Sequence, residues 1–121
     1  PNYKANRSSP PEELIMQLPI AIDWIDKMGY KTLGQTGFEA DDMIATVAYH
    51  AKEQGFNVRV VSHDKDLYQL IEDGKIVVVD AIKKKSMDES ACFDKYGVTP
   101  AQFTDYQSIL GDSADNVPGV D

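Results

Sequence analysis

The chain has 121 residues, of which 42% are hydrophobic and 26% charged, as in an ordinary globular domain with its own core. No apolar run reaches the eighteen residues that a membrane span requires, and the single cysteine, Cys92, excludes an internal disulfide and favours a reducing compartment. The net charge of −8 differs from the basic footprint of most DNA-binding proteins, unless many carboxylates lie around metal ions. Because the chain begins at Pro1, with neither Met nor a signal-peptide pattern, we expect a segment of a longer protein.

The first half of the chain predicts two helices and a short strand. Apolar side chains recur at helical spacing over residues 10–28, with Ser9 as the expected N-cap and a kink or interruption at Pro19. Residues 30–33 are a short strand candidate. Residues 39–54 return to the 3.6-residue period and predict a second helix.

The second half alternates short apolar strands with helices. The elements expected are a buried strand over 58–62, a short helix over 65–71, a strand over 76–79, a basic loop or edge over 83–87, helices over 88–96 and 100–110, and turns over 111–121. This alternation predicts an α/β fold with a mostly parallel central sheet flanked by helices. In such sheets the functional crevice lies at the carboxyl ends of the strands, where the acidic motifs fall.

The first acidic motif opens the helix predicted over 39–54. It places Glu39, Asp41 and Asp42 in the first turn, where carboxylates complement the helix dipole. Three acids in four positions exceed what the dipole needs, so both a structural and a functional interpretation stay open.

Two further acidic motifs follow. Asp64 and Asp66 come directly after a buried strand, and residues two apart in an extended segment project to the same side, although Asp64 could equally cap the next helix. Asp112 and Asp115 lie in a Gly- and Asn-containing segment that Asx-type turns would also explain. The run of lysines at 83–85 is typical of a solvated turn and could also contact phosphates.

The three motifs supply seven carboxylates, which repel one another if they converge. Each close pair costs ~1 kcal/mol in bulk water and ~4 kcal/mol at an effective dielectric constant of about 20. Convergence therefore requires cations, and oxygen ligands without His or Cys favour Mg²⁺ or Mn²⁺. Two such ions can activate water and stabilise the departing oxygen of a phosphate ester, so the sequence suggests phosphoryl chemistry.

Read in order, the motifs resemble the 5′-nuclease domain, a 5′–3′ exonuclease and flap endonuclease, at the N-terminus of bacterial DNA polymerase I. The similar segments are YKANR at 3–7, GFEADD at 37–42, DKDLYQL at 64–70, KYGV at 95–98 and GDSADNVPGV at 111–120. The resemblance runs nearly from end to end, and five ordered segments are far more specific than any one.

The resemblance implies a PIN-like core with two divalent metal ions, Mg²⁺ or Mn²⁺, that hydrolyses DNA with a free 5′ end, such as flaps and nicked duplex. The residues that fall on the family's metal-site acids are Glu39, Asp41, Asp42, Asp64, Asp66, Asp112 and Asp115. Lys4 and Arg7 match the basic gateway helix, where Lys4 would contact the scissile phosphate and Arg7 would help to steer it. The expected roles are primer removal and DNA repair in the bacterial cytoplasm, at the nucleoid, with a polymerase following in the parent chain.

The resemblance also divides the chain into three segments. Residues 1–9 would be a remnant of the gateway region, residues 10–110 the PIN-like core without its first strand, and residues 111–121 the start of a helix–turn–helix-like DNA-binding element. Because the first strand carries a metal-binding Asp in the family, we expect this fragment to cleave weakly or not at all.

Two alternatives remain open. A non-catalytic module that binds DNA structure would suit an inactive fragment with a charge of −8, and tight binding without metal would support it. A PIN-like ribonuclease would share the carboxylate core, but the segment at 111–120 disfavours it.

Overall fold

The computed structural model describes residues 3–5 and 7–120; residues 1, 2, 6 and 121, which belong to the segments predicted at 1–9 and 111–121, lie outside the described residues. The elements in chain order are α1 (Glu12–Lys27), α2 (Ala40–Glu53), β1 (Val58–Val61), the 3₁₀ helix η1 (Lys65–Leu70), β2 (Ile76–Asp80), β3 (Lys85–Met87), α3 (Glu89–Tyr96), the 3₁₀ turn η2 (Pro100–Gln102) and α4 (Phe103–Leu110). None of the helices in the described part has both the length and the apolar character that crossing a membrane requires.

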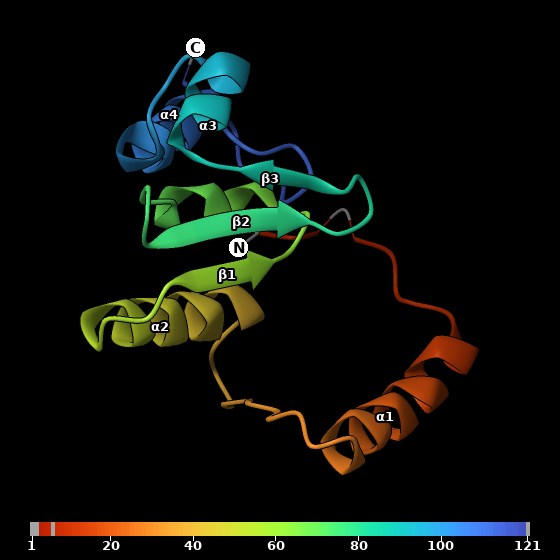
Figure 1. Ribbon diagram of the computed structural model, residues 1–121. Coiled ribbons are helices and arrows are strands. Elements are labelled where there is room, and N and C mark those ends of the chain that lie inside the picture. Colours follow the sequence, from red (N-terminus) through yellow and green to blue (C-terminus); the bar gives the residue numbers. More distant parts are fainter. Residues whose placement is uncertain (1–2, 6, 121) are drawn as a thin grey trace.

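The strands form one small mixed sheet in the order β1-β2-β3 (Figure 1). β1 and β2 are parallel, with Val60 opposite Val78, as the alternation of strands and helices predicts. β2 and β3 are antiparallel, with Asp80 opposite Lys85, so the sheet is mixed instead of mostly parallel. The reason is the short turn at 81–84, which can join only antiparallel neighbours.

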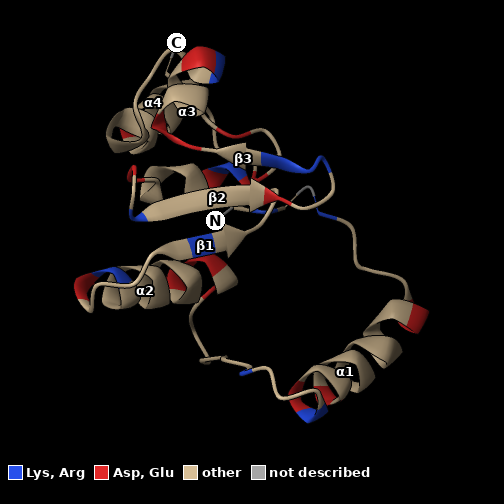
Figure 2. Ribbon diagram, in the orientation of Figure 1, with Lys and Arg blue, Asp and Glu red and all other residues tan. Residues whose placement is uncertain are grey.

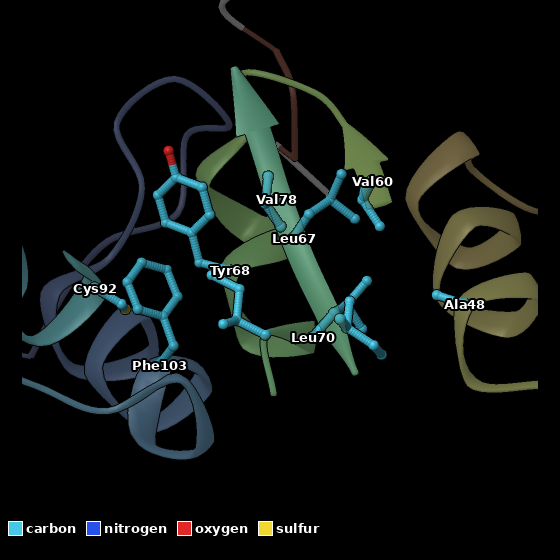
Figure 3. Packing of buried hydrophobic residues seen from close by; sticks show 10 residues of the cluster. Ala48, Val60, Leu67, Tyr68, Leu70, Val78, Cys92 and Phe103 are labelled. Carbon is cyan, nitrogen blue, oxygen red and sulfur yellow. The ribbon is translucent and has the colours of Figure 1, made fainter. Parts of the chain in front are cut away.

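The hydrophobic core lies on the side of the sheet covered by η1, α3 and α4 and extends to α2 beside β1 (Figure 3). Phe103 and Cys92 are fully buried, and Val78 on the central strand is almost so. Tyr68 and Phe103 pack edge to face, with ring centroids 5.8 Å apart. Cys92 is a free cysteine that belongs to this buried core.

Helix α1 stands away from the sheet, and no residue of this described helix is buried (Figure 1). The helix starts one residue after Pro11, which makes no side-chain cap, so the predicted N-cap at Ser9 is wrong. Of the kink or interruption predicted at Pro19, the interruption is wrong, because the helix continues through this residue. The carbonyl group that loses its donor to Pro19 faces solvent on this exposed helix, and water can satisfy it.

Two other elements differ from their predictions. Residues 30–33 form no strand: none of the described strands pairs with them, and an unpaired strand has no ladder to stabilise it. The short helix predicted over 65–71 is a 3₁₀ helix, η1, that Asp64 caps by accepting a hydrogen bond from the Asp66 N–H. The other predicted helices and the strands at β1 and β2 are confirmed within a few residues.

Candidate active site

A cleft of about 660 Å³ opens where β1 and β2 end. Six of the seven predicted carboxylates line it, namely Glu39, Asp41, Asp64, Asp66, Asp112 and Asp115, together with Lys4 and Arg7. Figure 2 shows the acidic first turn of α2 and the basic β2–β3 turn at the end of the sheet where the arrowheads of β1 and β2 lie. The fold therefore gathers segments that are far apart in sequence, such as those carrying Arg7 and Asp115, which are 108 residues apart.

The acidic residues at the start of α2 have two roles: some line the cleft, and some cap the helix. Glu39 is the N-cap residue, and its backbone N–H donates to the Asp42 carboxylate at 3.0 Å, which closes a capping box. Glu39 and Asp41 line the cleft, whereas Asp42 lines a smaller neighbouring hollow of about 170 Å³ with Asp41 and Asp66. Asp42 thus serves the helix start, and its carboxylate lies beside the cleft instead of in its lining.

The residues after β1 reach the cleft through an extended segment and the start of η1. The Asp64 carboxylate accepts the Asp66 N–H at 3.1 Å, so Asp64 both caps η1 and lines the cleft. Gln107 on α4 donates its side-chain amide to the Asp66 carboxylate. Burial raises the pKa of the Asp66 carboxyl above its ordinary value; the Gln107 hydrogen bond lowers that pKa, and the charge of Asp64 raises it.

The loop after α4 carries Asp112 and Asp115 and is held by backbone pairing. Asp112 and Val117 exchange N–H···O bonds of 2.8 Å in each direction. Gly111 has φ +77°, and a Cβ there would lie 2.4 Å from the backbone nitrogen of Gly119. Only glycine fits so close an approach of two backbones, so this glycine pair fixes where the last acidic motif lies.

Three ion pairs cross the cleft: Lys4 with Glu39, Arg7 with Asp115, and Lys65 with Asp112. The Lys65 ammonium lies 2.9 Å from the Asp112 carboxylate and lowers the pKa of that carboxyl below its ordinary value. The backbone N–H of Lys4 also donates to the Asp115 carbonyl at 2.8 Å, which docks the N-terminal segment on the last acidic loop. Protein cations therefore offset part of the repulsion that the converging carboxylates would otherwise suffer.

The donor chemistry of the cleft fits the hard divalent ions that the family implies. The carboxylates offer oxygen ligands only, which suit Mg²⁺ and Mn²⁺. Among the described residues no three His, Cys, Asp or Glu side chains stand close enough to hold one ion, because several carboxylates turn toward Lys, Arg or Gln partners. Binding an ion would require these side chains to exchange a protein partner for the metal.

Several lining residues were missed by reasoning from the sequence. Lys65 lies between two predicted ligands and pairs with a third, Asp112. Lys95 and Tyr96 reach the cleft from the end of α3, next to Tyr68 from η1. These residues lie in the segments at 64–70 and 95–98 that resemble the 5′-nuclease domain, and this was the available sign that they belong to the site. Their spacing along the sequence could not show that the two segments meet in the folded chain.

The comparisons with known proteins agree with this geometry. The family described as the 5′-3′ exonuclease, N-terminal resolvase-like domain, matches residues 1–97 of the 121. The chain belongs to this 5′-3′ exonuclease family. The resemblance drawn from the motifs is thereby confirmed.

Relatives of this 5′-3′ exonuclease domain are found among curated bacterial proteins. DNA polymerase I of Helicobacter pylori is 46% identical over 113 residues, which cover 93% of this chain and 12% of the relative. The 5′-3′ exonuclease of Buchnera aphidicola (subspecies Schizaphis graminum) is 42% identical over 118 residues, covering 98% of this chain and 41% of the relative. The chain thus spans less than half the length of these relatives.

Solved structures share the fold of the exonuclease domain. A mutant of the T5 5′-exonuclease has a TM-score of 0.80 and 26% identity, over 89% of this chain and 44% of that one. The T5 5′-exonuclease with bound zinc has a TM-score of 0.78 and 25% identity, over 100% of this chain and 48% of that one. The α/β class and the PIN-like 5′-nuclease core are confirmed.

Proposed function

We propose that this chain is part of a metal-dependent 5′-3′ exonuclease and flap endonuclease that hydrolyses DNA phosphodiesters near a free 5′ end. The observation that carries the proposal is the convergence of six family-matched carboxylates with Lys4 and Arg7 on one cleft. Membership of the 5′-3′ exonuclease family supports the reaction class. The T5 5′-exonuclease with bound zinc supports the use of divalent ions. The oxygen-only carboxylate set is the reason to propose Mg²⁺ or Mn²⁺ at two positions here.

The residues of the cleft would divide the work by charge. Two divalent ions, when bound, would supply an activated water and stabilise the leaving oxygen. The carboxylates that would hold them are Glu39, Asp41, Asp64, Asp66, Asp112 and Asp115, with Asp42 alongside and orienting the first turn of α2. Lys4 and Arg7 would exchange their present carboxylate partners for substrate phosphates, Lys4 as a point charge and Arg7 as a two-pronged donor.

The biological setting follows from the relatives. DNA with a 5′ flap or a nick is the proposed substrate, consistent with a T5 flap endonuclease complex with DNA and metal ions. Because DNA polymerase I relatives carry this stretch in a much longer chain, we place a polymerase downstream. Primer removal and repair in the bacterial cytoplasm, at the nucleoid, is the corresponding role. Residues 1–9 and 111–121 would serve as gateway remnant and start of the DNA-binding element.

The test uses a 5′-labelled flap duplex with Mg²⁺, applied to this chain and to the full-length protein that contains it. Asp64→Asn should slow cleavage by about 100-fold or more, since even residues that only support a metal ligand cost 10- to 100-fold. Asp94→Asn, on the exposed side of α3 outside the cleft lining, is the matched control and should leave the rate unchanged. Equal cleavage by Asp64→Asn and wild type in the full-length protein would show that the site is wrongly assigned.

A second candidate function is a non-catalytic module that binds DNA structure. The three ion pairs across the cleft favour its non-catalytic part, because protein cations already neutralise part of the acidic cluster without metal. Binding of the flap duplex at equal affinity in EDTA and in divalent metal, without cleavage by the full-length protein, would support this candidate over the nuclease.

A further inference from the structure

Two cations of the cleft stand apart from the acidic cluster. Lys83 in the β2–β3 turn and Lys95 near the end of α3 both line the cleft. Lys4, Arg7 and Lys65 are each engaged with a cleft carboxylate. Within the described part of the chain, neither Lys83 nor Lys95 pairs with any of the six carboxylates that line the cleft. Their charge is therefore available at the wall of the cleft.

The β2–β3 turn holds Lys83 in a defined position. The Asp80 carboxylate accepts the N–H groups of Ile82 and Lys83 at 3.0 and 2.9 Å, and Lys84 takes a left-handed conformation with φ 53°. The ammonium of Lys83 lies 3.7 Å from the Asp80 carboxylate, at the outer limit of an ion pair, and its side chain is 71% exposed. A fixed backbone thus carries a solvent-accessible cation toward the cleft.

Lys95 contacts aromatic rings and forms no ion pair with any described carboxylate of the cleft. Its ammonium lies 4.7 Å from the centre of the Tyr96 ring and 6.0 Å from that of Tyr68, and both rings line the same cleft. Such cation–π contacts hold the side chain in place and leave its positive charge unneutralised. A cation beside aromatic rings is the combination with which proteins bind single-stranded nucleic acid, through phosphate contacts and base stacking.

The geometry points to Lys83 and Lys95 as a second phosphate-binding wall of the cleft, which holds the backbone of a single DNA strand next to the carboxylate cluster. This inference rests on the proposed nuclease function and deepens it. Lys4 and Arg7 compete for cleft carboxylates, whereas this wall can bind phosphates without giving up a partner in the cluster. It acts by positioning the strand and takes no part in bond cleavage.

The test measures binding of a fluorescent 5′-flap DNA by this chain in Ca²⁺, over a range of salt concentrations, with a gel to confirm that the DNA stays intact. Lys83→Ala and Lys95→Met should each weaken binding about 5- to 10-fold near 0.1 M salt, and lower the slope of log affinity against log salt by about 0.7–0.9, the value for one lost phosphate contact. Met keeps the stem of Lys95 against the Tyr96 ring.

Lys75→Ala is the matched control, because Lys75 is an exposed lysine just before β2, at the opposite end of the same strand from Lys83. It should leave affinity and slope unchanged, and Lys83→Arg should retain wild-type binding. Circular dichroism checks that each variant is folded. If wild type binds while Lys83→Ala and Lys95→Met behave like Lys75→Ala, the inference is overturned and the nuclease proposal stands. If wild type binds no DNA at any salt concentration, the inference is overturned as well, and the nuclease proposal is decided separately by the cleavage assay on the full-length protein.

Discussion

At the scale of single residues, the role and the pKa of an acidic side chain in this domain depend on its surroundings. Asp80, which matches no predicted metal ligand, accepts two backbone N–H groups in the β2–β3 turn, and the hydrogen bond from Lys83 is the main reason that its pKa is lower than usual. Asp66 shows the opposite shift, because burial raises its pKa. The sequence alone gives both residues the same chemistry, and only their surroundings separate a turn-forming carboxylate from a cleft-lining one.

The lowered pKa of Asp80 predicts a pH-dependent contribution to stability. Because the folded chain holds this carboxyl ionised more strongly than the unfolded chain does, the stabilisation is fully present above the unfolded Asp pKa of about 3.9. It is lost as the pH falls through the lower folded value. Asp80→Ala should therefore lower the free energy of unfolding at pH 7, with a smaller difference from wild type at pH 3.

Urea unfolding at the two pH values measures this difference. Asp73→Ala is not a suitable control, because the Asp73 carboxylate accepts the Glu89 N–H. Asp94→Ala, an exposed acid on α3, serves instead. A loss for Asp80→Ala that is the same at pH 3 and pH 7 would show that its carboxylate charge does not stabilise the turn.

At the scale of elements, the position of the last acidic motif depends on a glycine contact more than on the acids themselves. Helix α4 ends at Leu110, and the chain then folds back so that residues 111 and 119 meet. The pairing of Asp112 with Val117 closes the loop. Asp112 and Asp115 line the cleft on this paired loop, so we expect a change in the loop to alter the site.

Gly111→Ala tests that dependence. Gly111 has φ 77° and ψ −178°, a region of backbone space used almost only by glycine, which costs of order 1–3 kcal/mol for other residues. The added Cβ would also lie 2.4 Å from the Gly119 nitrogen. We expect lower stability in thermal unfolding and weaker binding of Mn²⁺ by calorimetry.

Gly74→Ala is the matched control for this substitution. It also has a positive φ, of 73°, but nothing lies within 4 Å of its added Cβ, so it carries backbone strain without a clash and lies outside the lining of the cleft. It should lower stability and leave Mn²⁺ binding unchanged. Equal Mn²⁺ binding by Gly111→Ala and wild type would mean that the loop does not hold Asp112 and Asp115 in place.

At the scale of the whole molecule, a net charge of −8 sits on a protein proposed to bind a polyanion. The cleft concentrates the opposing charges, with Lys4, Arg7 and Lys65 engaged by carboxylates. Apart from Lys83 and Lys95 at the wall, phosphates that approach the cleft therefore meet cations that are already neutralised and carboxylates that repel them. Divalent ions would reverse both effects by binding the carboxylates and releasing the cations.

DNA binding by this chain should accordingly depend on divalent metal. We expect fluorescence anisotropy to show tighter binding of a 5′-flap duplex in Ca²⁺ than in EDTA, at constant ionic strength. The gain should be at least about fivefold, which corresponds to ~1 kcal/mol, the interaction of one charge pair about 4 Å apart in bulk water. Asp112→Asn should reduce this gain, whereas Asp94→Asn should not. Equal affinity in EDTA and Ca²⁺ would contradict a metal-dependent cleft and favour the non-catalytic alternative.

The sequence by itself determined the elements whose signals are local. Apolar periodicity predicted the helix that begins with Glu39 at its N-cap, and β-branched runs predicted the strands Val58–Val61 and Ile76–Asp80. The ordered acidic motifs gave the family, which the comparisons confirm. These features depend on residues that are close together along the chain, so the sequence alone is enough to predict them.

Only the tertiary structure decided the features that depend on distant partners. Residues 30–33 have strand-like composition but no described strand to pair with, while Lys85–Met87 becomes a strand because β2 lies beside it. Asp42 turns to cap α2 instead of lining the cleft, and Lys65 pairs with Asp112 across 47 positions of chain. Hydrogen-bond pairing and charge pairing act through space, so the same residue types give a strand or a loop, and a cap or a cleft-lining acid, according to what the fold brings next to them.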